Sequence, residues 1–72
     1  MSRLPAVRVS LDKKLDVESC KKINDQILGM KGVLGAYFNA KAKEIIVTCD
    51  GSIKTKREIR KISGVTGIRH QL

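Results

Sequence analysis

The chain has 72 residues and a formal net charge of +8, from 15 Lys and Arg side chains against 7 Asp and Glu. This length supports a single domain spanning residues 1–72, and because only Tyr37 and Phe38 are aromatic, its core has to be aliphatic. The two cysteines exclude a disulfide framework, no apolar run reaches the length of a membrane span, and the opening MSRLPAVRV lacks the hydrophobic region of a signal peptide. We therefore expect a soluble, reduced, cytoplasmic protein whose basic surface suits acidic partners.

The first half of the chain predicts a strand, a helix and a second strand. Residues 6–11 (AVRVSL) alternate between apolar and polar side chains, as in a half-buried strand. Asp16 is placed to cap a helix, and Gly32 to supply a left-handed stop after it. The apolar stripe of that helix consists of Val17, Cys20, Ile23, Ile27 and Met30. Residues 33–38 (VLGAYF) form the second strand.

The second half predicts a strand, a helix and a strand. Residues 44–49 (EIIVTC) alternate as a third strand, and the short NAKAK turn makes it an antiparallel hairpin with the second strand. Thr55 opens a second helix, with Glu58 completing a capping box. The buried stripe of this helix is Ile59, Ile62 and either Val65 or Thr66. Residues 68–72 (IRHQL) form a short last strand. This order predicts a ferredoxin-like α+β fold, a four-stranded antiparallel sheet with two helices on one face.

The tetrapeptide Gly-Val-x-Gly occurs at residues 32–35 and again at 64–67. We interpret the two copies as unequal. Gly32 ends the first helix, whereas Gly64 lies in or just before the last turn of the second helix, and Gly67 takes the place equivalent to Gly32. Because glycines that follow a helix cannot cradle a phosphate at a helix N-terminus, neither copy predicts a nucleotide loop.

Residues 27–50 (ILGMKGVLGAYFNAKAKEIIVTCD) combine an apolar helix stripe, Gly-Val, apolar side chains at Ala36 and Phe38, a basic turn and the run EIIVTCD. A capped helix and Gly67-Ile68 follow. In this joint spacing nearly the whole chain resembles the heavy-metal-associated domain family of copper chaperones, metal-transporting ATPases and mercuric-ion-binding proteins. The resemblance implies the scaffold of that family and an ancestral role in carrying a soft metal ion.

The departure from the family lies in the loop before the first helix. The family carries Met-x-Cys-x-x-Cys there, and its two thiolates bind a soft ion such as Cu(I) or Hg(II). The resemblance places the Met on Lys14 and the two Cys on Asp16 and Ser19, none of which is a soft-metal ligand. We therefore expect the family's metal-carrying role to be lost and no cofactor to be bound. Whether the loop from Asp12 to Ser19 binds an anion instead stays open.

The two cysteines and the single histidine have structural alternatives to metal binding. Cys20 follows the lost thiolate position by one residue and is the remaining candidate ligand, but it also lies on the helix stripe, where a free Cys packs as a small hydrophobe. Cys49 lies on an inward-facing strand position. His70 has no partner of ligand type nearby in sequence, so we expect a surface or edge residue. No pairing of residues supports nucleophilic or acid–base catalysis, and an enzyme is not expected.

Two surfaces are candidates for binding. The sheet face away from the helices is predicted to carry Arg8, Ser10, Tyr37, Ile46 and Thr48. Tyr37 and Ile46 lie on neighbouring strands there and suggest a contact with a partner protein or a second copy. The second helix has a basic outer face made of Lys56, Arg57, Arg60 and Lys61.

The simplest interpretation of the basic helix face is a solvated surface. The alternative is non-specific nucleic-acid binding through phosphate contacts, because sequence-specific RNA recognition needs more aromatic side chains than Tyr37. The leading hypothesis is therefore a non-enzymatic binding module that acts through protein contacts or self-association. Nucleic-acid binding and residual soft-metal binding through Cys20 are the alternatives, and no membrane partner is expected.

Overall fold

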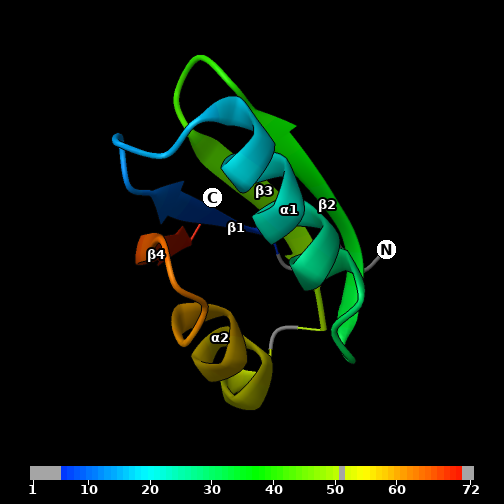
Figure 1. The fold of residues 1–72 in the computed structure, drawn as a ribbon. Helices are drawn as coiled ribbons and strands as arrows, with labels where there is room; N and C mark the ends of the chain where they lie inside the picture. Colours follow the sequence, from blue (N-terminus) through cyan, green and yellow to red (C-terminus); the bar gives the residue numbers. More distant parts are fainter. Residues whose placement is uncertain (1–5, 51, 71–72) are drawn as a thin grey trace.

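The computed structural model describes residues 6–50 and 52–70 and contains six elements in the predicted order. These are β1 (Ala6–Leu11), α1 (Val17–Leu28), β2 (Val33–Asn39), β3 (Glu44–Cys49), α2 (Ile53–Arg60) and β4 (Val65–His70). The strands form one antiparallel sheet in the order β2-β3-β1-β4. Figure 1 shows α1 in front of β2 and β3, with α2 below it. The predicted ferredoxin-like α+β fold is confirmed.

A single aliphatic core lies between the helices and one face of the sheet. Alternate side chains of the two central strands are buried, as the sequence alternation predicts: Val7, Val9, Leu11, Ile45, Val47 and Cys49. The helices add Cys20, Ile23, Ile27, Ile59 and Ile62 to the same cluster. Full burial of one such aliphatic side chain contributes about 1.5–3 kcal/mol, so this cluster is the main source of stability. Tyr37 is exposed and Phe38 packs at the edge of the core.

The first helix is capped as predicted but is shorter than its predicted stripe. The Asp16 carboxylate accepts a hydrogen bond from the backbone N–H of Ser19 at 2.8 Å. Val17 is 48% exposed, contrary to prediction, because the buried stripe begins one turn later, at Cys20. Met30 lies beyond the helix end and is half-buried in the connection to β2.

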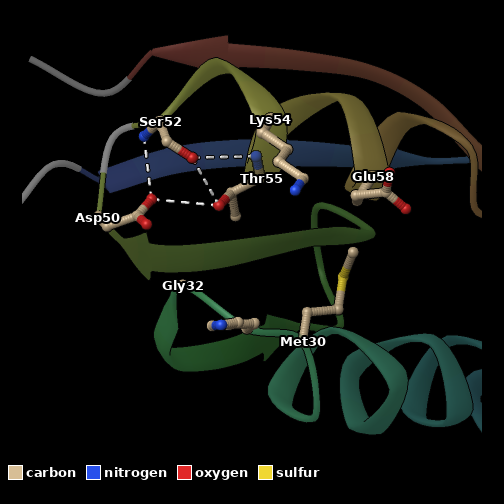
Figure 2. A pocket seen from close by; sticks show the side chains of 8 residues that line it. Met30, Gly32, Asp50, Ser52, Lys54, Thr55 and Glu58 are labelled. Carbon is tan, nitrogen blue, oxygen red and sulfur yellow. Dashed lines mark hydrogen bonds between the residues drawn. The ribbon is translucent and has the colours of Figure 1, made fainter.

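The second helix begins earlier and ends earlier than predicted. Its cap is Ser52, whose Oγ accepts from the backbone N–H of Thr55 at 3.1 Å. The Asp50 carboxylate accepts from the backbone N–H of Ser52 at 2.9 Å and so fixes the turn in which Ser52 can cap (Figure 2). The predicted Thr55–Glu58 capping box is therefore wrong, because Thr55 already lies inside the first turn.

The last strand begins three residues earlier than predicted. Val65 and Thr66 were expected on the second helix, but both lie on β4, because α2 ends at Arg60. Val65 is half-buried and packs against the core from the strand. Gln71 and Leu72, the end of the predicted strand, lie outside the described residues.

The two Gly-Val-x-Gly segments occupy equivalent places, and the predicted equivalence of Gly32 with Gly67 is wrong. Gly32 and Gly64 have φ angles of +93° and +99°, and each directly precedes a strand. Each glycine carbonyl accepts a hydrogen bond from the backbone N–H of an aspartate. The Gly32 carbonyl accepts from Asp50 at 2.8 Å, and the Gly64 carbonyl accepts from Asp12 at 2.9 Å. In both copies the strand then bulges opposite its neighbour, between Val33 and Gly35 in β2 and between Val65 and Gly67 in β4.

Candidate protein-binding surfaces

The loop between β1 and α1 uses its carboxylates to hold its own backbone. Asp12 accepts from the backbone N–H of Lys14 at 2.9 Å, and Asp16 accepts from that of Ser19 at 2.8 Å. Of the three positions that the sequence resemblance singled out, Lys14 is exposed, Asp16 caps α1, and the backbone N–H of Ser19 donates to the Asp16 carboxylate. The Ser19 backbone and hydroxyl lower the pKa of Asp16, and the ammonium groups of Lys22 and Lys43 lower it further.

A lysine from the turn between β2 and β3, which lies beside the end of β1, donates to the backbone of this loop: the backbone N–H of Leu11 bonds to the Lys43 carbonyl at 3.0 Å, and the Lys43 ammonium reaches two loop carbonyls. Lys43 Nζ lies 2.6 Å from the carbonyl oxygens of both Lys13 and Leu15. Its backbone, in the turn between β2 and β3, has a φ of +49°, which is uncommon for a residue other than glycine. The Lys43 ammonium is therefore bound to the backbone of the loop between β1 and α1. Sequence reasoning treated Lys43 only as part of a basic turn and missed this contact, because nothing local indicates a bond to residues so distant in the chain.

Both thiols lie in the core. Cys20 on α1 and Cys49 on β3 are fully buried and unpaired. Among residues 6–50 and 52–70, no group of three or more His, Cys, Asp or Glu residues could hold a metal ion. The prediction for His70 concerns a side chain outside the described part of the structure. In the described structure Cys20 packs as an apolar side chain, and a metal ion would have to displace core contacts to reach it.

The sheet face away from the helices carries the predicted row of side chains. Tyr37 pairs with Ile46, and Ile46 pairs with Arg8, so the three lie side by side on β2, β3 and β1. Tyr37 is 69% exposed, and no described helix covers this face. Thr48 lies two residues after Ile46 on β3, half-buried, opposite Gly35. Ser10 lies two residues after Arg8 on β1, opposite Glu44, so all five residues predicted for this face lie on it.

A buried carboxylate completes one end of this face and was missed in the sequence. Glu44 is only 9% exposed and lies between two guanidinium groups, 3.9 Å from Arg8 and 3.7 Å from Arg69. Such cross-strand pairs of opposite charge contribute roughly 0.2–1 kcal/mol each. The two-residue period that places Ile46 and Thr48 on this face also includes Glu44, so the strand alternation alone could have predicted that Glu44 lies there. The face therefore runs from an aromatic edge on β2 to a charged edge on β4.

The basic face of α2 divides into two parts. Lys61 directly follows the last residue of the helix and pairs with Glu58 at 3.4 Å. Arg57 and Arg60 are exposed and line a shallow groove of about 210 Å³ between α2 and β4. The other residues lining that groove are Ile53, Lys56 and Ile68.

The apolar side chains of the groove are Ile53 and Ile68, and Ile53 precedes the helix start that the sequence predicted at Thr55. Ile53 is the first residue of α2 and is 69% exposed. Its spacing of four and seven residues from Arg57 and Arg60 puts all three on one helix face, and this spacing was the signal available in the sequence. The groove therefore combines an exposed β-branched side chain with two guanidinium groups.

A larger cleft of about 460 Å³ lies between the start of β2 and the first turn of α2 (Figure 2). Its walls carry both signs of charge, with Lys31 and Lys54 beside Asp50 and Glu58. The backbone N–H of Ser52 lowers the pKa of Asp50, and the Thr55 and Ser52 side chains lower it further. The polar groups of Asp50, Ser52 and Thr55 therefore hydrogen-bond one another and hold the helix cap (Figure 2).

Within the described ranges, no helix is both long and apolar enough to cross a membrane. Comparison of the chain with protein-family models, with curated proteins and with solved structures finds no match. The resemblance to the heavy-metal-associated domain family therefore stays a prediction from the sequence, and the functional argument depends on the surfaces described above.

Proposed function

We propose that this protein is a non-enzymatic binding module that contacts a partner protein, or a second copy of itself, through the uncovered face of its sheet. The observation that carries the proposal is the row of Tyr37, Ile46 and Arg8, which places an exposed aromatic ring beside a β-branched side chain and a guanidinium group. Tyrosine and arginine are the residue types most enriched at the energetic centres of protein interfaces.

A photo-crosslinker at the position of Tyr37 tests this proposal in the host cell. We expect benzoylphenylalanine in place of Tyr37 to give a discrete covalent adduct with one partner or with a second copy. The matched control carries the same group in place of Lys21, which is exposed on α1 on the opposite side of the molecule. Equal labelling from both positions, or no adduct from either, would contradict a binding role for the sheet face.

We further propose that the scaffold is that of a heavy-metal-associated domain whose loop no longer carries metal. The support is the non-ligand set Lys14, Asp16 and Ser19, together with the Lys43 ammonium bound to the loop carbonyls. Titration of the reduced protein with Cu(I) tests this directly, and we expect no tight one-to-one complex. Tight binding that disappears in Cys20→Ser would restore the metal-carrier alternative.

Restoring the family's metal-binding residues tests whether the scaffold is that of a heavy-metal-associated domain. The triple variant Lys14→Met, Asp16→Cys, Ser19→Cys restores the family's ligand pattern on this loop. If the scaffold is the proposed one, this variant binds one Cu(I) ion per chain, with both thiolates as ligands. The same variant with Ser19→Ala in place of Ser19→Cys, which leaves only one of the two family thiolates, serves as the control, and equal Cu(I) affinity in both variants would argue against the resemblance.

Non-specific nucleic-acid binding is the second candidate, favoured by the exposed guanidinium groups of Arg57 and Arg60 and by the net charge of +8. It predicts that the logarithm of the binding constant falls linearly with the logarithm of salt concentration, with a slope of about −3 to −5 if several cations contact phosphates. Absence of a gel shift at low salt would remove this candidate.

A further inference from the structure

The groove between α2 and β4 has dimensions and chemistry that suit a side chain of a macromolecular partner. Its volume of about 210 Å³ is below the roughly 300–1,000 Å³ of sites that enclose a small ligand. Ile53 and Ile68 supply its apolar surface, and Arg57 and Arg60 stand at its rim. None of the residues that line it is acidic.

The edge of the sheet runs along this groove. β4 is the outer strand, and within the described ranges it pairs only with β1. An edge strand presents a row of unpaired backbone N–H and C=O groups, which is a template for the addition of another strand. The groove therefore combines backbone hydrogen-bonding groups with a specific set of side chains.

The register fixes which side chain of an added strand would enter the groove. Ile68 pairs with Val9, which is fully buried beneath the helices, so Ile68 also faces the helix side of the sheet. Paired residues on adjacent strands point to the same face, so the residue opposite Ile68 on an added strand points between β4 and α2. The residues two positions before and after it lie on the same side, along the guanidinium rim.

We infer that this groove binds an extended acidic segment of a partner protein, which adds as a strand to β4. An aliphatic side chain of the segment fills the space between Ile53 and Ile68, and carboxylates two residues to either side pair with Arg57 and Arg60. Charge complementarity selects the acidic segment, because both rim cations are exposed and the groove offers no carboxylate of its own. This surface lies on the helix side of the sheet and does not depend on the sheet-face contact proposed above.

A protein segment suits the groove better than a nucleic acid. Phosphate contacts would use the guanidinium groups but would leave Ile53 and Ile68 without a role. Single-stranded nucleic acids are held by stacking of bases on aromatic rings, and the residues lining the groove include none. Burial of exposed aliphatic surface on a strand-like ligand accounts for both kinds of residue.

The probe for this inference is the capped peptide Thr-Glu-Thr-Ile-Thr-Glu-Thr, which places Glu two residues to each side of a central Ile. Amide NMR spectra of the reduced full chain are recorded during titration with the peptide at low salt. We expect shift changes confined to α2 and β4, with the Tyr37 amide unmoved. A peptide with Lys in place of Glu, and a thymidine oligonucleotide, are titrated in parallel.

Substitutions at exposed positions separate binding from folding. We expect the double variant Arg57→Glu, Arg60→Glu to weaken peptide binding at least about tenfold, because two attractive charge pairs become repulsive. The control variant Lys21→Glu, Lys22→Glu changes the net charge equally on exposed sites of α1 and should stay within about twofold of the parent affinity.

A second matched pair tests the apolar part of the groove. Ile53→Ser should weaken binding about fivefold or more, whereas Val17→Ser, also at the exposed first position of a helix, should not. Absence of shifts at millimolar peptide, shifts at the sheet face, or equal binding of the Lys peptide would overturn the inference. An oligonucleotide that binds more tightly than the peptide at α2 would overturn it in favour of a nucleic-acid surface.

Discussion

The two Gly-Val-x-Gly copies allow a comparison in which the first glycine of each copy is essential and the second is not. Gly32 and Gly64 have φ angles of +93° and +99°, in a region that L side chains rarely adopt. A methyl group on Gly32 would lie 2.5 Å from Thr55 Oγ1 and 2.8 Å from Asp50 Oδ2. A methyl group on Gly64 would lie 2.8 Å from Leu15 Cδ1 and 3.0 Å from Ile23 Cδ1. Alanine at either position therefore meets both backbone strain and a steric overlap.

The cost of each substitution depends on whether the overlapping neighbour can move. The positive φ alone costs roughly 1–3 kcal/mol for a residue with a side chain. The Thr55 hydroxyl is held by Ser52 at 2.8 Å and by Asp50 at 3.2 Å, so displacing it breaks the cap of α2 as well, at a further cost of about 1 kcal/mol. The neighbours of Gly64 are the ends of two aliphatic side chains, Leu15 and the buried Ile23, and because no hydrogen bond holds either end, a small rotation of each relieves the overlap. We therefore expect Gly32→Ala to lower the unfolding free energy by about 3 kcal/mol and Gly64→Ala by about 2 kcal/mol.

Urea unfolding followed by circular dichroism measures these differences, with Gly35→Ala and Gly67→Ala as matched controls. A methyl group on either control glycine would meet nothing within 4 Å, so we expect a change below about 1 kcal/mol, in the stabilising direction if there is any. In a domain of this size Gly32→Ala should lower the Tm by roughly 12–24 °C. Equal changes in stability for alanine at all four glycines would refute the conclusion that only the first glycine of each copy is required for the fold. A larger loss of stability for Gly64→Ala than for Gly32→Ala would show that the hydrogen-bonded Thr55 hydroxyl is not what makes Gly32 the more sensitive position.

Three further predictions concern the loops and the helix cap. Lys43→Met should lower the unfolding free energy by about 1–3 kcal/mol, because two loop carbonyls lose a charged donor at 2.6 Å. The control is Lys41→Met, at an exposed position of the same turn, which should have little effect on urea unfolding. Ser52→Ala should cost about 1 kcal/mol in thermal unfolding if Ser52 is the cap of α2, and no loss would favour a later helix start. Hydrogen bonds hold the pKa values of Asp16 and Asp50 below their ordinary value in the folded state, so the stability they provide is present above their unfolded pKa, near 4, and is lost as the pH falls through the folded values. The Tm should accordingly decline below about pH 5. If the Tm of the double variant Asp16→Asn, Asp50→Asn declined as steeply as that of the parent, these two carboxylates would not be the cause of the acid sensitivity.

Local periodicity in the sequence determined the elements and their faces. The alternation at residues 6–11 and 44–49 predicts which side chains enter the core, because successive side chains of a strand must point to opposite faces. The same rule placed Tyr37, Ile46 and Arg8 on the outer face, where the structure has them. The cap at Asp16 was also predictable, since a capping residue acts within three residues of its own position.

Where two residues could fill the same role in a helix cap or turn, the sequence pattern did not select the one that the structure uses. Ser52 and Thr55 are both suitable caps, and the sequence pattern favoured Thr55 because of Glu58. The structure selects Ser52, which the Asp50 carboxylate holds in the turn. Because α2 has 8 residues against 12 in α1, and its preceding loop is also shorter, the equivalent glycine comes earlier than the family spacing suggested. Gly64 rather than Gly67 is therefore the counterpart of Gly32.

The features of greatest functional interest depend on residues far apart in the chain. Lys43 binds carbonyl oxygens about 30 residues away, and Ile68 lies beside Ile53 and Arg57 only because β4 returns to the edge of the sheet next to α2. The sequence determined what each residue is and, through the periods of strands and helices, which way it faces. Only the tertiary structure decided which residues meet, because strand order and chain return are set by burial of one shared core rather than by any local pattern.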